Sequence, residues 1–124
     1  MITVELEEIF VDLQINDDRS GGTAKVKCPA DFAAFEGHFP GEPVLPGVIQ
    51  LAAVRVFSSS ITGVLLVPVS TGRLKFNGMV RPEEEIDLSV NLERKDECWE
   101  ARFRFKRGGD KISAGTIVYK EAES

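Results

Sequence analysis

The only histidine of the chain, His38, lies in a loop that contains three prolines. Pro40, Pro43 and Pro46 each fix φ and remove a backbone N–H donor, so the loop is neither a helix nor a central strand. The pair Pro46-Gly47 then opens an apolar run, and proline is tolerated in the first turn of a helix. A titratable imidazole in a rigid loop before a helix suits chemistry on a polarised oxygen. His38 is therefore a candidate catalytic residue.

The apolar run predicts one long helix, from Gly47 to about Ser60. Its polar exceptions are Gln50 and Arg55, and a triplet of serines followed by Gly63 ends it. A helix that is apolar almost all round is buried rather than lying on a surface. The residues after the histidine loop are therefore expected to form the centre of the fold.

Apolar and polar residues alternate with period two through most of the remaining chain, which predicts strands with one wet face. In the last of these segments, Ile112, Ala114, Thr116 and Val118 are expected to share one face. Sequential strands of this kind form an antiparallel sheet, and with one buried helix this is an α+β architecture. The edges of such a sheet must be paired or covered, so a dimer is expected. The predicted strands cover residues 9–15, 23–28, 73–77, 85–93, 99–106 and 111–118.

Length and composition predict a single domain over residues 1–124. The net charge of -5 argues against nucleic acid and against an anionic membrane as partners. The N-terminus has no basic region or cleavage signature, and no apolar stretch could span a bilayer, so we expect a cytoplasmic protein. Cys28 and Cys98 show no metal-ligand spacing, so free thiols and no metal site are expected.

The histidine loop and the start of the helix resemble the 3-hydroxyacyl-(acyl carrier protein) dehydratases of the FabA/FabZ type, which have the hotdog fold. The residues from Leu45 to Gln50 are closer still to the small ApeI-like branch associated with aryl-polyene and similar lipid pathways. The resemblance implies a curved antiparallel sheet wrapped around one long buried helix. The matching segments are Phe35, Gly37-His38-Phe39-Pro40, Pro43-Val44, Pro46-Gly47-Val48, Arg73-Leu74-Lys75-Phe76 and Val80-Arg81-Pro82.

The resemblance also implies roles for individual residues. His38 would remove the proton next to a thioester carbonyl, and the N–H of Gly47 would stabilise the negative charge that develops on the carbonyl oxygen. A carboxylic acid on the central helix of a partner subunit would then help the 3-hydroxyl leave as water. No cofactor is implied. The expected substrate-binding residues are Phe39, Val48, Leu51, Ala52 and Phe76.

This chain departs from the family pattern at the position of the acid. The acid falls fourteen residues after the histidine, and that position is Ala52, which has no proton to donate. Arg55 lies near the same helix face and Gln50 does not. Glu36 and Glu42 flank the loop as possible substitutes. Since general acid–base help is typically worth ~10²–10⁴ in rate, its loss would slow dehydration without abolishing thioester binding.

Three functions follow from these observations. The first is a dehydratase of 3-hydroxyacyl thioesters in fatty-acid or related lipid biosynthesis, a lyase whose substrate is carried on acyl carrier protein or coenzyme A. The second is a catalytically impaired subunit that binds acyl thioesters, in a homodimer, a higher homo-oligomer or a heterodimer with a related chain that supplies the acid. The third and less favoured is a thioesterase of the same fold. Basic residues that could meet an acidic carrier protein are Arg73, Lys75, Arg81, Arg102 and Arg104.

Overall fold

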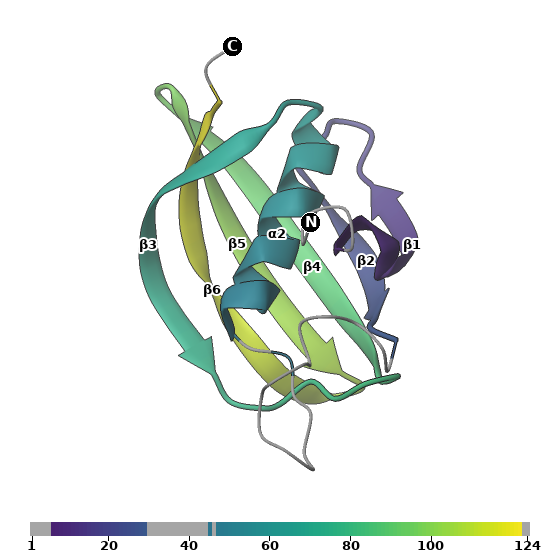
Figure 1. Ribbon diagram of the computed structural model, residues 1–124. Coiled ribbons are helices and arrows are strands. Elements are labelled where there is room, and N and C mark those ends of the chain that lie inside the picture. The colour runs from purple at the N-terminus through teal and green to yellow at the C-terminus, as the bar shows by residue number, and fades with distance from the viewer. Residues whose placement is uncertain (1–5, 30–44, 46, 123–124) are drawn as a thin grey trace.

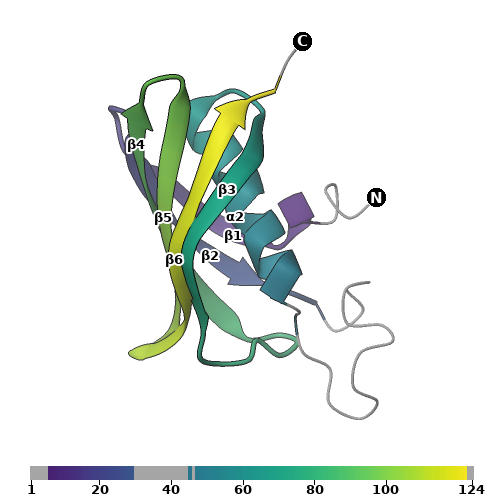
Figure 2. The same cartoon turned by 90° about the vertical axis from the view of Figure 1, so that its left-hand side faces the viewer.

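A computed structural model describes residues 6–29, 45 and 47–122. A six-stranded antiparallel sheet in the order β1-β2-β4-β5-β6-β3 curves around the single long helix α2 (Figure 1). Seen from the side, the sheet forms one layer and α2 lies against its concave face (Figure 2). The elements are β1 (Phe10–Ile15), β2 (Gly21–Lys27), α2 (Gly47–Thr62), β3 (Leu66–Phe76), β4 (Glu85–Lys95), β5 (Cys98–Arg107) and β6 (Asp110–Glu121).

Helix α2 begins at Gly47 as predicted and continues two residues beyond the predicted end. Ala53, Val54, Phe57 and Ile61 are each at most 1% exposed, because the sheet covers this face of the helix. Gly63 ends the helix in the left-handed region with φ 81, where a residue without Cβ is unstrained. The predicted buried central helix is confirmed.

Strands β4 and β5 show the predicted alternation most clearly. Ile86, Leu88 and Val90 are buried on the face toward the helix, and the residues between them face outward. The outward residues form exposed ion pairs such as Lys25–Glu85 at 3.0 Å, which contribute little to stability. One apolar face around a buried helix confirms the α+β hotdog architecture.

The predicted face of β6 is wrong beyond Ile112. The structure buries Ser113, Ile117 and Tyr119, while Ala114, Thr116 and Val118 are only half-buried. The reason is a β-bulge: Phe105 pairs with Ser113 but Lys106 pairs with Lys111, so Ile112 is an extra residue in β6. A bulge of one residue reverses which residues face the core.

Strand β3 is longer than predicted and forms one edge of the sheet. It starts at Leu66, whereas the sequence pattern indicates a strand only from Arg73. Pro68 and Gly72 lie inside it, and both residue types are unusual in central strands. An edge strand accommodates them because one side of its backbone has no neighbour within the sheet. The opposite edge is β1.

Within the described ranges, no helix combines the length and apolar character needed to cross a membrane. The same residues contain no group of three or more histidine, cysteine, aspartate or glutamate side chains that could hold a metal ion. Cys28 is buried and Cys98 is half-buried, and both are free thiols as predicted.

Candidate functional site

The candidate site lies at the N-terminal end of α2. His38 and Phe39, the expected base and its neighbour, lie outside the described residues, as do Glu36 and Glu42. Gly47 is the first residue of the helix and packs against the ring of Phe76, at the end of β3. A Cβ built on Gly47 would lie 3.0 Å from Cε1 of this ring. The structure thus brings together two of the predicted site residues, and glycine permits the close contact.

Backbone N–H groups at this end of α2 are suited to stabilising negative charge. The first turn of a helix has N–H groups without an intrahelical acceptor, and the helix dipole is positive there. Two apolar side chains at this end are exposed in the single chain, Val48 by 72% and Phe76 by 46%. Polar backbone donors beside an uncovered apolar surface can bind a carbonyl oxygen that carries an apolar chain.

A buried polar pair anchors the start of the helix to the sheet. The hydroxyl of Ser113 on β6 donates to Oε1 of Gln50 at 2.7 Å, and these residues are 0% and 2% exposed. Nε2 of Gln50 makes a long contact of 3.4 Å with the carbonyl oxygen of Leu45. The N–H of Leu45 donates to the carbonyl oxygen of Val80 at 2.7 Å. Leu45 is therefore held from two sides, two residues before Gly47.

This anchoring role of Gln50 was not predicted. The signal available in the sequence was an amide side chain in an otherwise apolar part of a buried helix. A buried amide needs partners for its polar atoms. Its partner is 63 residues away, and nothing local in the sequence indicates which residue that would be.

Ala52 and Arg55 lie on the same side of the helix, as predicted, and line one cavity. Leu51 and Ala52 are both half-buried and pack against the core. Nε of Arg55 donates to the carbonyl oxygen of Leu66 at 2.6 Å, which fixes the guanidinium beside the start of β3. Among the described residues that line this cavity, only Glu7 is acidic. The described part of the site therefore places no carboxyl group on the helix at Ala52.

Two buried protonated groups lie within the core near this helix. Burial raises the pKa of the Cys28 thiol to about 12. Burial also raises the pKa of the Tyr119 hydroxyl well above its usual range, an effect that Arg55 and Ser58 partly oppose. The hydroxyls of Tyr119 and Ser58 reach no well-formed hydrogen bond within the described structure. Both groups stay protonated at neutral pH, so neither is suited to act as a base.

Comparison with solved structures shows the same fold in proteins of different sequence. A chain of the dehydratase heterocomplex ApeI:P from Xenorhabdus doucetiae matches with a TM-score of 0.76 and 21% identity, over 91% of this chain and 97% of that chain. A hypothetical thioesterase from Streptococcus pneumoniae, solved with coenzyme A, matches with a TM-score of 0.69 and 8% identity, over 99% of this chain and 95% of that chain. At these identities the likeness establishes the hotdog fold alone.

Sequence comparison gives the family. The 3-hydroxyacyl-[acyl-carrier-protein] dehydratase FabZ of Oenococcus oeni is 30% identical over 68% of this chain and 67% of its own length. FabZ of Chloroflexus aggregans is 36% identical over 48% of this chain, and the match spans 46% of the length of that relative. The family model for ApeI-like proteins, described as ApeI dehydratase, matches residues 14–116. This chain belongs to the ApeI-like dehydratase family.

Proposed function

We propose that this chain acts on 3-hydroxyacyl thioesters as a dehydratase. His38 takes the proton from C2, and the N–H of Gly47 stabilises the oxyanion that forms on the thioester carbonyl. The 3-hydroxyl leaves as water with a proton supplied by Glu42, by a water that Arg55 orients or by a partner chain, and a trans-2-enoyl thioester remains. The observation that carries this proposal is the start of α2 at Gly47, beside exposed apolar side chains at Val48 and Phe76.

The enzyme proposal is tested by incubating the full chain with 3-hydroxyacyl and trans-2-enoyl thioesters and following the enoyl absorbance. His38→Ala is expected to lower the rate about 10²-fold or more. Asn91→Ala, an exposed change on β4, serves as the control and should leave the rate unchanged. An undiminished rate in His38→Ala would contradict the proposal. Release of free thiol, without enoyl formation, would instead identify a thioesterase.

A second candidate function is a subunit that binds the acyl thioester but depends on a partner for the acid. Its support is Ala52, which lines a cavity beside Arg55 without contributing a carboxyl group. The neighbour from Xenorhabdus doucetiae is a heterocomplex, which makes a related partner chain a reasonable source of the acid here. Ala52→Glu separates the two functions: a large gain from no detectable activity favours the binding subunit, and little change on an active background favours the enzyme.

The edge of β3 is the proposed contact for a second copy or a related chain. This edge strand has 11 residues and exposes Val69 by 53% and Phe76 by 46%. The other edge, β1, has only 6 residues and so offers fewer backbone groups for pairing. Val69→Lys should lower the oligomer mass measured by light scattering. Val11→Lys on β1 is the matched control and should not.

A basic hollow on the outer face of the sheet supports an acyl carrier protein as the substrate carrier. Arg73 and Lys75 on β3 face Arg102 and Arg104 on β5 across small residues of β6, in a hollow of about 270 Å³. Within the described ranges, only Arg102 of these four has a carboxylate within 4.0 Å. Cations that lack counter-ions favour an acidic partner. Arg104→Glu should raise KM for carrier-bound substrate while leaving KM for the coenzyme A thioester unchanged.

A further inference from the structure

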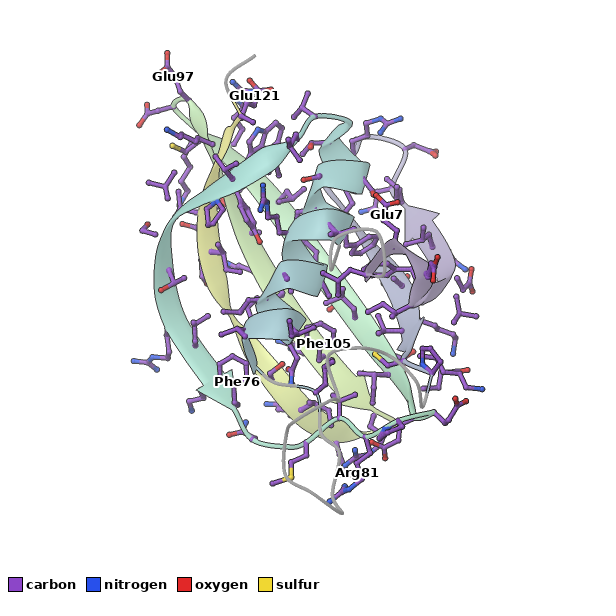
Figure 3. All side chains as sticks on the ribbon, in the orientation of Figure 1. Glu7, Phe76, Arg81, Glu97, Phe105 and Glu121 are labelled. Carbon is purple, nitrogen blue, oxygen red and sulfur yellow. The ribbon has the colours of Figure 1, made fainter. Side chains whose placement is uncertain are left out.

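The cavity beside Ala52 lies on the side of α2 that faces away from the sheet. Figure 2 shows the N-terminal turn at residues 6–8 on this side of the helix. Figure 3 labels Glu7 on the turn, next to α2. The cavity has a volume of about 360 Å³, within the range of small-molecule sites. Its walls are Ala52, Arg55, Val56, Ser59, Ser60 and Gly63, and Leu6, Glu7 and Leu65 complete its lining.

Arg55 is a half-buried cation in the wall of this cavity. Its Nε–H is held by the carbonyl oxygen of Leu66 at 2.6 Å, so the guanidinium plane is fixed. The terminal N–H groups remain, and no carboxylate of the described residues lies within 4.0 Å of them. A partly desolvated charge without a counter-ion is unfavourable. An anion in the cavity would remove this cost.

The rest of the wall indicates which kind of anion fits. Ala52, Val56, Leu6 and Leu65 offer apolar surface, which suits a ligand with one charge and a hydrocarbon body. A guanidinium matches a carboxylate with two parallel hydrogen bonds. Ser59 adds a hydroxyl whose oxygen accepts from the N–H of Leu66 at 3.0 Å, so its proton is free to donate.

We propose that this cavity binds a small apolar monocarboxylic acid, with its carboxylate on Arg55 and its hydrocarbon body against Ala52, Val56 and Leu65. The volume lies within the range of small-molecule sites and admits a medium-chain acid of about eight carbons. Glu7 at the rim repels the ligand and limits its affinity. The cavity shares Ala52 with the proposed acyl-thioester site, so this proposal rests on the proposed function and deepens it. It adds Arg55 as the partner of a carboxylate, a group that a thioester does not carry.

The proposal is tested with octanoate and its uncharged analogue octanamide, by calorimetric titration of the full chain. Octanoate should bind at least tenfold more tightly than octanamide. Arg55→Gln should lose at least tenfold in octanoate affinity, whereas Arg102→Gln on the outer face of the sheet should not change it. Glu7→Gln, which removes the repelling charge, should tighten octanoate binding several-fold.

Ala52→Leu provides a second variant that leaves Arg55 untouched. It fills the cavity next to the guanidinium, so octanoate binding should fall at least tenfold even if Arg55→Gln does not fold. Equal affinity for octanoate and octanamide, no octanoate binding, or unchanged binding in Ala52→Leu would each overturn the proposal. The octanamide comparison separates this proposal from the proposed function, because an acyl site alone would bind octanoate and octanamide equally. Dehydration is measured separately, by the rate of enoyl formation.

Discussion

Replacing Gln50 with leucine tests whether the buried polar pair holds the start of α2 against the sheet. Gln50→Leu keeps most of the side-chain volume but leaves the hydroxyl of Ser113, 0% exposed, without its acceptor at 2.7 Å. A buried polar group that loses its only partner costs about 1–3 kcal/mol. The long contact to Leu45 at 3.4 Å adds little. We expect the free energy of unfolding to fall by about 2 kcal/mol, and Tm by about 5–10 °C for a chain of this size.

Ser113→Ala and the double variant Gln50→Leu with Ser113→Ala complete a double-mutant cycle. Ser113→Ala alone should cost about as much as Gln50→Leu, because it leaves the amide oxygen unpaired. The double variant should cost no more than either single change, since no unpaired group remains. Urea unfolding, followed by the fluorescence of the single tryptophan Trp99, measures all three. Ser60→Ala, on an exposed part of α2, is the control and should change stability by less than about 0.5 kcal/mol. Additive losses in the double variant would refute the reasoning.

Three further changes test other contacts. In urea unfolding, Gly47→Ala should lower the free energy of unfolding by about 1 kcal/mol less in a Phe76→Ala background than in the unchanged chain, because the ring limits the space at Gly47. Equal losses in the two backgrounds would contradict this contact. Since burial raises the pKa of Cys28 from 9.0 to about 12, the folded chain keeps a proton that the unfolded chain loses, so stability should fall as pH rises from 9 toward 12. Cys28→Ala should reduce the dependence of stability on pH in this range, measured by unfolding at several pH values. An unchanged dependence would contradict the raised pKa of Cys28. Tyr119→Phe removes a hydroxyl without a well-formed hydrogen bond, so the free energy of unfolding should stay the same or rise by about 1 kcal/mol. A fall of that size would show that the hydroxyl is well bonded.

Local periodicity was enough to predict the helix and the central strands. β4 alternates over residues 85–92 and β5 over residues 101–105, so each residue type there directly indicates its face. The start of α2 was predictable because Pro46-Gly47 precedes an apolar run. The face shared by Ala52 and Arg55 followed from helical spacing alone.

The remaining features depend on contacts between distant residues. The bulge at Ile112 exists only in the pairing of β6 with β5, so the strand pattern gave the wrong face beyond it. Pro68 belongs to a strand because β3 lies at an edge, which is a property of the whole sheet. The role of Gln50 depends on Ser113, which only the folded sheet brings near.

The extra residue in β6 has a consequence for the evolution of the chain. Because of the bulge, Ser113 faces inward at the level of the first helical turn, where it meets Gln50. Deleting Ile112 would restore regular pairing but would shift either the strand or the hairpin by one place. The hydroxyl and the amide would then be separated, even though neither residue had changed. Insertions and deletions should therefore be tolerated poorly here and more readily at the Gly108-Gly109 turn, where an added Cβ would meet no atom within 4 Å.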